Sequence, residues 1–361
     1  MGPALVGGLH GAASSWSLTS IADAQALFDP EGTYLNTASY GLPPRPAFDA
    51  LQAALDDWRH GRTSWEGWNA TTDRARAGFA RLVGADPANV AVGGSASGLV
   101  GLVAASLPAG TRVVVPEIEF TSVLFPFLAQ PGLEVTTVPV ARLADAIDET
   151  VGVAAFSVVQ MSTGELADLD AILAAAAAHD VMTLADASQA AGWLPLDATR
   201  FDFLVAIGYK WLLSPRGTAW MAVAPERLDS IVPASASWFA SGDPYDAFIG
   251  PPLRLPGDAR RLDSSPAWFS WVGSVPALEL LGEVGIDAIH EHDLALANRF
   301  RAALGMDPGD SAIVTVEGDL DRLWAAGIQA AQPGRKVRVG FHLYNDDEDA
   351  DRLVDVLLGL G

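Results

Sequence analysis

Short apolar runs alternate with longer amphipathic stretches along the chain from residue 90 onward. The apolar runs have the length and β-branched content of buried strands, which we expect at 90–92, 112–115, 134–138, 151–157, 181–185, 203–207 and 219–223. The amphipathic stretches predict helices that include 97–107, 121–129, 141–148 and 168–178. Such alternation is typical of βα units with right-handed crossovers. We therefore expect an α/β fold with a mostly parallel, seven-stranded sheet.

The pattern is less regular before residue 90. Residues 34–41 predict an extended segment and a turn, and the prolines that follow place the start of a helix near Arg45. Residues 61–69 predict a Gly-flanked loop that carries Trp65 and Trp68. These rings could line the mouth of a ligand site or pack on their own domain, and the pattern leaves both open.

The pattern changes again after about residue 235. A stretch rich in Pro, Gly, Ser and aromatic residues at 233–269 suggests a crossing between domains. Beyond it we expect helices and strands at 274–284, 287–304, 312–316, 319–326, 336–341 and 346–359. We therefore predict an N-terminal segment (1–44) that packs on the small domain, a large ligand-binding domain (45–235) and a small C-terminal α+β domain (236–361).

The composition narrows the classes of function. The chain of 361 residues is 50% hydrophobic and 18% charged, as in globular proteins with ample core, and its net charge of −22 argues against a nucleic-acid or anionic-membrane partner. It contains no Cys, which excludes disulfides, thiolate metal sites and Cys nucleophiles. Residues 1–15 lack the basic start and long apolar core of a signal peptide, and the longest apolar stretch, near 171–178, is too short to span a membrane. We expect a cytoplasmic protein.

Two apolar runs end near residues of opposite charge. Asp186 lies near the end of one run, and Lys210 follows the other between Tyr209 and Trp211. Ligands of α/β sheets bind beyond the carboxyl ends of the strands, so both side chains are expected to face one crevice. A buried acid beside a buried lysine suits pyridoxal phosphate, which has an aldehyde and a basic ring nitrogen and is held as a lysine Schiff base with an acidic partner on the ring.

Two other patterns carry weaker signals. Residues 93–98, which read Gly-Gly-Ser-Ala-Ser-Gly, follow a predicted strand and open a predicted helix, where backbone N–H groups can bind phosphate, although most such turns are only turns. His290 and His292 are two residues apart in a helical pattern, so their side chains diverge by about 200°. We expect a solvent-facing helix surface there and no metal site.

Six segments, taken in order, resemble the motifs of one protein family. They are Tyr34-Leu35-Asn36-Thr37-Ala38, Gly94-Ser95-Ala96-Ser97, residues 159–164 (Val-Gln-Met-Ser-Thr-Gly), Asp186-Ala187-Ser188-Gln189, Gly208-Tyr209-Lys210-Trp211, and Val337-Arg338-Val339 with Tyr344-Asn345. The chain resembles, from about residue 34 to 358, the class V aminotransferase family, which includes cysteine desulfurases, selenocysteine lyases, kynureninases and isopenicillin-N-epimerase-like proteins. The resemblance implies the fold-type I architecture of pyridoxal 5'-phosphate enzymes, a homodimer and an amino-acid substrate.

The resemblance also implies roles for residues at matching positions. Lys210 would form the Schiff base and later move protons at the substrate α-carbon, and Asp186 would keep the pyridine nitrogen protonated. Gln189 would hydrogen-bond the phenolic oxygen of the ring or the neighbouring imine. Arg338 would bind the substrate α-carboxylate through a bidentate fork, and the alternative for it is a surface salt bridge.

Further positions follow from the same resemblance. Those implied to bind the cofactor phosphate are Ser95, Ala96 and Ser97. Gln160 lies in a cofactor-binding segment, and Asn36 is implied to contact the substrate. In the family, a neighbouring subunit often offers a Thr to the phosphate, and the similar stretch at 261–266 suggests that Ser264 or Ser265 does this here. The active site is therefore expected to be composite across a homodimer.

The chain departs from the family pattern at four positions. Phe120 occupies the place of a His that stacks on the ring, so a proton relay through that position is lost. Ser188 lies where the family often has Ala beneath the ring. Ile207 replaces a phosphate-binding Ser, and Tyr209 replaces the His before the lysine, so Tyr209 could substitute for the lost donor.

The reaction is less closely defined than the cofactor. We expect an enzyme that forms an external aldimine with an α-amino acid, and a lyase at the β-carbon or side chain is the first hypothesis. Without a Cys, such a lyase could not hold a persulfide. The alternatives are an aminotransferase, an amino-acid epimerase and, outside enzymes, a regulatory protein that binds pyridoxal phosphate.

Overall fold

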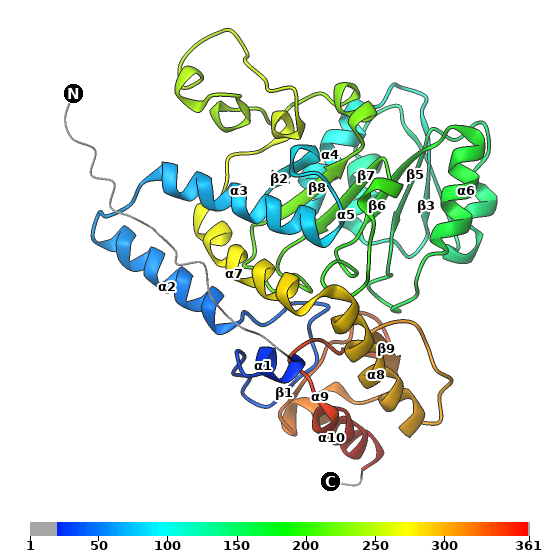
Figure 1. The fold of residues 1–361 in the computed structure, drawn as a ribbon. Coiled ribbons are helices and arrows are strands. Elements are labelled where there is room, and N and C mark those ends of the chain that lie inside the picture. The colour runs from blue at the N-terminus through cyan, green and yellow to red at the C-terminus, as the bar shows by residue number, and fades with distance from the viewer. Residues whose placement is uncertain (1–19, 360–361) are drawn as a thin grey trace.

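A seven-stranded sheet forms the centre of the computed structural model, which describes residues 20–359 (Figure 1). Its order is β2-β8-β7-β6-β5-β3-β4. The strands are β2 (Val90–Gly93), β3 (Arg112–Pro116), β4 (Glu134–Val138), β5 (Val153–Ser157), β6 (Met182–Asp186), β7 (Phe203–Ile207) and β8 (Ala219–Val223). The pairs from β4 to β7 are parallel, whereas β8 is antiparallel to both β7 and β2. The predicted α/β fold with a mostly parallel sheet is confirmed.

Both faces of this sheet are covered, which explains why its central strands are continuous apolar runs. On one face Ala155, Leu184 and Val205 pack with the apolar residues of α4 (Ala96–Ser106) and α5 (Thr121–Leu128). On the other face Phe156 and Leu204 belong to a cluster that includes residues of α3 (Trp65–Leu82), α6 (Leu169–His179) and α7 (Trp268–Val284). Because side chains alternate along a strand, adjacent residues of one run enter different clusters.

Two predicted elements are wrong. Residues 61–69 are not a loop throughout, since α3 begins at Trp65; the ring of Trp65 packs on Trp238 at a centroid distance of 5.5 Å, and such tertiary packing overrides the loop signal of the neighbouring glycines. The expected helix at 141–148 consists of two 3₁₀ turns, Val140–Arg142 and Ala144–Ala146. Its buried positions, Leu143 and Ile147, are the residues that directly follow each turn.

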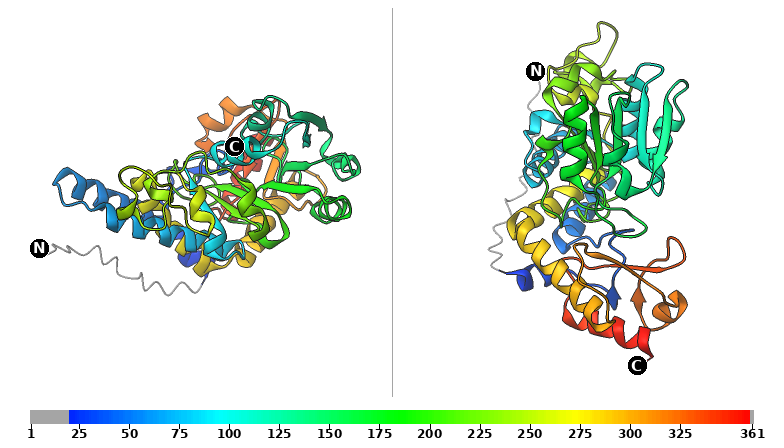
Figure 2. Two further views of the ribbon diagram at one scale, coloured as in Figure 1. Left: turned by 90° about the horizontal axis from the view of Figure 1, so that it is seen from above. Right: turned by 90° about the vertical axis from the view of Figure 1, so that its right-hand side faces the viewer.

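A smaller unit lies beside the large sheet. Here β9 (Ile313–Val316) pairs antiparallel with β11 (Val337–Gly340), and β1 (Thr33–Tyr34) pairs with β10 (Ile328–Gln329). The helices near these strands are α1 (Ile21–Gln25), α8 (Ile286–Ala303), α9 (Leu320–Ala325) and α10 (Asp347–Leu358). The right-hand view of Figure 2 shows these orange and red elements beneath the green strands of the large sheet.

The residues around β1 join this smaller unit. Leu35 is fully buried among its apolar residues, and the Gly340 N–H donates to the Leu35 carbonyl. The prediction for residues 1–15 falls outside the described residues, and the domain limits at 44/45 and 235/236 stay predictions. Ala259 and Leu262, which lie beyond the predicted limit at 235/236, pack with strand residues of the large sheet. In the described chain no helix has the length and hydropathy needed to cross a membrane.

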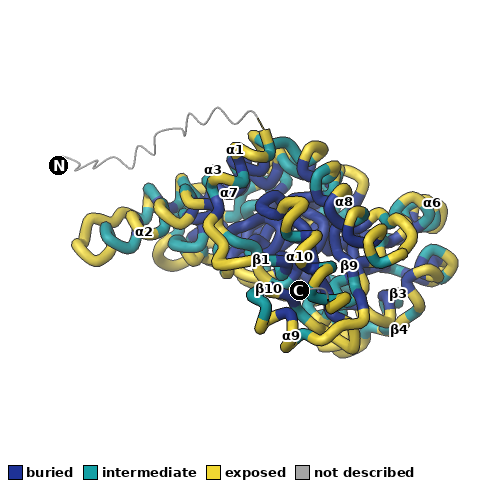
Figure 3. Tube along the Cα trace, turned by 90° about the horizontal axis from the view of Figure 1, so that it is seen from below, coloured by how far each residue is buried: buried dark blue, intermediate teal, exposed yellow. Residues whose placement is uncertain are grey.

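The remaining long helix lies at the edge of the molecule. Helix α2 (Arg45–Arg59) packs on α7, and it starts where the sequence predicts a helix, at Arg45. Its outer end is exposed (Figure 3). The part of the tube that lies in space between the labels β1 and α8 is mostly buried. The cavity described next lies between the segment after β1, the residues around β11 and the large sheet.

Candidate active site

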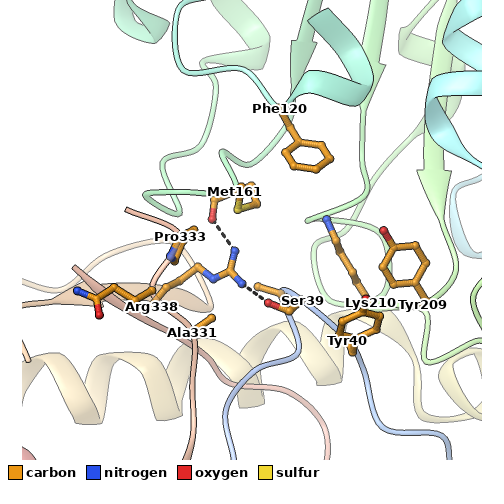
Figure 4. Close-up of a pocket in the computed structure, with 11 residues that line it drawn as sticks. Ser39, Tyr40, Phe120, Met161, Tyr209, Lys210, Ala331, Pro333 and Arg338 are labelled. Carbon is orange, nitrogen blue, oxygen red and sulfur yellow. Dashed lines mark hydrogen bonds between the residues drawn. The ribbon is translucent and has the colours of Figure 1, made fainter. Parts of the chain in front are cut away.

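A cavity of about 370 Å³ lies between the carboxyl ends of the large-sheet strands and the small sheet (Figure 4). Its walls come from loops after β1, β3, β5 and β7 and from residues around β11; they are Ala38, Ser39, Tyr40, Phe120, Met161, Tyr209, Lys210, Ala331, Gln332, Pro333 and Arg338. The structure thus brings Lys210 and Arg338, which are 128 residues apart in the chain (338 − 210), to one cavity.

Lys210 follows β7 and reaches into the cavity from a buried backbone. Its side chain is 6% exposed, and its Nζ lies 5.3 Å from the centroid of the Phe120 ring. Burial lowers the pKa of Lys210 to about 8; Asp186 opposes this shift, whereas the charges of Arg338 and Arg216 add to it. A lysine with this pKa has a much larger neutral fraction near pH 7 than a free lysine, and the neutral amine is the form that attacks an aldehyde.

The backbone around Lys210 leaves no room for a side chain on the facing segment. The Gly41 N–H donates to the Tyr209 carbonyl at 2.9 Å, and a Cβ at Gly41 would lie 2.0 Å from the Lys210 carbonyl oxygen. Close backbone approach of this kind requires glycine. The loop that carries the lysine is therefore fastened to the segment after β1.

Asp186 is the last residue of β6 and is also buried, at 4% exposure. Its Oδ1 accepts from the Ser188 N–H at 2.8 Å, and the Ser188 hydroxyl accepts from the Ile207 N–H at 3.2 Å. Burial raises the pKa of Asp186, while the Ser188 hydrogen bond and the charge of Lys210 oppose this shift. Within residues 20–359 this carboxylate has no ion-pair partner within 4 Å. A protonated ring nitrogen of a ligand could therefore serve as its cationic partner.

Gln189 makes other contacts than the sequence suggests. Its Oε1 accepts from Trp211 Nε1 at 2.8 Å, and its Nε2 donates to the Ala38 carbonyl at 3.0 Å. The orientation of this amide is fixed because an indole N–H can only donate. One Nε2 hydrogen remains for a ligand, so the contact of Gln189 with the cofactor stays a prediction.

A buried acid that the sequence analysis did not single out lies beside Asp186. Glu119 accepts from the Ser157 N–H at 2.7 Å, from the Ser157 hydroxyl, from the Phe120 N–H at 2.8 Å and from Gln160 Nε2 at 3.2 Å. Burial raises the pKa of Glu119, and the charge of Asp186 adds to this shift. The position directly before the stacking residue was the only signal in the sequence.

The contacts of Glu119 also orient Gln160. Because the Gln160 amide nitrogen faces the carboxylate, its buried Oε1 points elsewhere and has no hydrogen-bond partner in the described chain. A buried carbonyl oxygen without a partner is costly, and a hydrogen-bond donor on a ligand would satisfy it. This fits the predicted role of Gln160 in cofactor binding.

Arg338 lies on β11 and is 2% exposed, which excludes a surface salt bridge. Its Nη1 donates to the Met161 carbonyl at 3.0 Å and its Nη2 to the Ser39 hydroxyl at 2.6 Å (Figure 4). Burial lowers the pKa of Arg338 to about 10. No carboxylate of the described residues lies within ion-pair distance of it, so this buried cation can bind a substrate carboxylate.

Several predicted site residues do not line the cavity. Asn36 has a buried Oδ1 without a hydrogen-bond partner in the described chain. Ser95 is the N-cap of α4, where its hydroxyl accepts from the Gly98 N–H at 3.2 Å; Ala96 is buried and Ser97 is exposed. The Ser264 N–H donates to the Val92 carbonyl at 3.2 Å, and Ser265 is exposed. The roles of these residues stay predictions.

The two histidines of α8 contact other residues of this chain. His290 stacks on Trp193 at a centroid distance of 5.7 Å, so the expected solvent-facing surface is only partly present, and His292 Nδ1 lies 2.9 Å from Asp293 Oδ1. In the part of the chain that the structure describes, no three His, Cys, Asp or Glu residues group as metal ligands.

Known proteins resemble this chain in sequence and in fold. The sequence model described as aminotransferase class-V matches residues 35–319. An isopenicillin N epimerase of Streptomyces clavuligerus is 28% identical over 389 residues, which cover 92% of this chain and 95% of that protein. A kynureninase of Deinococcus radiodurans is 32% identical over 303 residues, covering 78% and 73%. A solved cystine C–S lyase, in complex with its product cysteine persulfide, shares the fold with a TM-score of 0.82 at 19% identity, covering 91% and 97%.

Proposed function

The chain belongs to the aminotransferase class-V family, and from this membership we propose that it is a lyase that acts at the β-carbon or side chain of an α-amino acid. It is a fold-type I enzyme that uses pyridoxal 5'-phosphate. The cofactor, when bound, supplies an aldehyde for amino groups and a ring that withdraws electrons from the substrate α-carbon. One observation carries the proposal: buried Lys210 and buried Arg338 face the same cavity.

Each residue of the candidate site would have a separate role in the reaction. Arg338 would bind the substrate carboxylate with N–H groups that Met161 and Ser39 leave free, which orients the α-carbon. Lys210 would then take and return a proton at that carbon, because its lowered pKa allows both steps near neutral pH. Asp186 would hold the proton of the ring nitrogen, and Phe120 would keep water from one side of the site.

The side chains around the cavity favour a lyase over an epimerase. Epimerisation by two bases takes a proton from one side of the α-carbon and returns it on the other. Phe120, Met161 and Pro333 cannot exchange protons, whereas Lys210 can. The phenols of Tyr40 and Tyr209 also line the cavity and are the next candidates for a second proton donor. Burial raises the pKa of Tyr209. Epimerisation through one of these phenols is therefore the second candidate function.

The absence of Cys constrains chemistry on a sulfur substrate. A persulfide cannot form on this protein, because no Cys is present to accept the sulfur atom. A thiol or sulfide would leave directly into solvent, and it would need a proton donor or prior activation of the substrate. We expect unactivated cysteine to be a poor substrate and any released sulfur to be free.

A panel of amino acids tests the reaction type. The purified protein, loaded with pyridoxal phosphate, is incubated with each amino acid in D₂O, and the products are identified by chiral chromatography and mass spectrometry. A lyase releases a side-chain fragment and returns the cofactor to its aldehyde form. Inversion with deuterium at the α-carbon and an intact side chain would support epimerisation instead. Accumulation of pyridoxamine phosphate would indicate transamination and overturn the lyase proposal.

We also propose a homodimer with a composite site. Tyr40, which lines the cavity, is 52% exposed, and Phe48, which lines a neighbouring cavity together with Tyr40, is 51% exposed. Large exposed aromatic residues at the rim of a site mark a surface suited to a second copy. Sedimentation of the loaded enzyme should give the mass of two chains.

A further inference from the structure

Three neighbouring carbonyls of the loop that carries Lys210 are each held by a different donor. The Tyr209 carbonyl accepts from the Gly41 N–H, and the Lys210 carbonyl accepts from the Leu213 N–H at 3.2 Å. The Trp211 carbonyl accepts from His342 Nε2 at 3.0 Å. The third contact differs from the others because its donor is a side chain from the segment that follows β11.

His342 belongs to a fully buried chain of polar groups. Its Nδ1 lies 2.9 Å from Asp293 Oδ2, and both side chains are 0% exposed. Asp293 is on α8, and its other oxygen faces His292. The contact therefore runs from a helix of the smaller unit, through an imidazole, to the backbone one residue beyond Lys210.

The donor and acceptor types of Asp293, His342 and the Trp211 carbonyl show how many protons these contacts need. A backbone carbonyl only accepts, so His342 Nε2 must carry a hydrogen. The contact between His342 Nδ1 and Asp293 Oδ2 needs one further proton, whichever atom holds it. Asp293 thus fixes the ring with Nε2–H aimed at the Trp211 carbonyl, in the way that a buried acid orients a histidine in other sites.

The surroundings leave the Trp211 carbonyl little freedom. Gly192 approaches so closely that a Cβ there would lie 2.2 Å from this oxygen. The Trp211 indole donates to Gln189, and its ring lies 5.1 Å from the His342 ring. A small displacement of His342 would therefore move the Trp211–Leu212 peptide, one residue beyond Lys210.

We propose that Asp293 and His342 are positioning residues that hold the Lys210 loop, through the Trp211 carbonyl, in register with the substrate-binding strand. The register follows from the chain itself: Arg338 lies on β11 and His342 follows two residues after its end. One short segment thereby carries both the guanidinium that would bind the carboxylate and the imidazole that holds the lysine loop. The inference rests on Lys210 as the cofactor lysine and is independent of which reaction follows.

Two substitutions at His342 separate this role from a merely structural one. Gln places an amide nitrogen at about the reach of Nε2, so His342→Gln keeps a donor for the Trp211 carbonyl but loses the partner of Asp293. Asn places its amide nitrogen near Nδ1, so His342→Asn keeps a partner for Asp293 but cannot reach the carbonyl. If His342 acts by holding the Trp211 carbonyl, the Gln variant should stay active. If His342 acts only as a partner for Asp293, the Asn variant should be the more stable of the two.

The readouts are measured with and without cofactor. Protein freed of cofactor is mixed with pyridoxal phosphate, and the rate of Schiff-base formation is followed by absorbance, with Lys210→Ala as blank. We expect His342→Gln to stay close to wild type and His342→Asn to be slower by roughly 10- to 100-fold, since a displacement of about 1 Å can cost about 100-fold. In the loaded enzyme, kcat of His342→Asn should fall with little change in KM, while thermal melting should rank Asn above Gln.

The wild-type protein supplies an independent test, which does not depend on folded variants. With ¹⁵N-labelled histidine, of which the chain has six, the His342 Nε2 should carry a proton that exchanges slowly with solvent. A His342 ring with its only proton on Nδ1, or equal Schiff-base rates in the Gln and Asn variants, would overturn the proposal. A Lys210→Ala protein that still forms the adduct would instead overturn the function proposed for Lys210.

Discussion

The candidate site has an inner wall of buried charged residues and an outer rim, and the two differ in how completely a single chain builds them. Asp186, Lys210 and Arg338 on the inner wall are 4%, 6% and 2% exposed, and hydrogen bonds hold the side chain or the surrounding backbone of each. The rim consists of Tyr40, which lines the cavity and is half exposed, and of Ser97 and Ser265, which are exposed outside the cavity and are predicted to contact the cofactor phosphate. Folding of one chain therefore preorganises the charged groups, whereas the rim would be completed by the cofactor phosphate and a second chain.

The largest effect should come from the inner wall, at Lys210. Lys210→Ala should abolish both Schiff-base absorbance and turnover, because the other lysine, Lys336, is exposed beside Glu317. Lys336→Ala is the matched control and should behave as wild type. A Lys210→Ala enzyme with normal activity would show that Lys210 takes no part in the reaction.

The second largest effect should come from the acid of the same wall. Asp186→Asn should still bind cofactor but lose most of its kcat, because a neutral amide cannot hold the proton of the ring nitrogen. The exposed Asp145→Asn serves as control. Spectra establish cofactor content and steady-state kinetics give kcat; unchanged turnover in Asp186→Asn would exclude this role.

The rim should respond in a different way, through a second chain. Replacement of both Ser264 and Ser265 by Ala should weaken cofactor retention more than it lowers kcat, since these hydroxyls would contact phosphate rather than the reacting atoms. Mixed dimers of this double variant with Lys210→Ala should recover one working site of two. A complete lack of complementation would contradict a shared rim.

A smaller effect concerns pH. The neutral amine forms the Schiff base, so its rate of formation should rise with pH and level off above about 8, rather than near the usual lysine pKa of 10.5. Between these two values the unfolded chain holds a proton on this lysine that the folded chain has lost, so the contribution of Lys210 to stability rises with pH there. In Asp186→Asn the plateau should begin at a lower pH, because Asp186 raises the pKa of Lys210. Stopped-flow absorbance across this range measures both; an unshifted plateau would argue that the acid and the lysine do not interact.

The sequence predicts the inner wall better than its supports. The predicted bounds of β7 match the structure and those of β6 are one residue off, because burial on both faces makes these strands continuous apolar runs. Asp186 and Lys210 follow the predicted runs. The start of α3 at Trp65 could not be predicted, because packing on a residue far along the chain decides it. The contact from His342 to Trp211 spans 131 residues, and nothing local in either segment signals it. Glu119 was accessible in principle, as an acid next to the residue expected to stack on the ring.

The identity of the lysine that bonds the cofactor tests the account most directly. The enzyme loaded with pyridoxal phosphate is reduced with borohydride, digested and mapped by mass spectrometry, which distinguishes Lys210 from Lys336 and from the N-terminal amine. One reduced cofactor per chain is expected, on the peptide that contains Lys210. A cofactor found on Lys336, or protein that carries no reducible cofactor after loading, would contradict it.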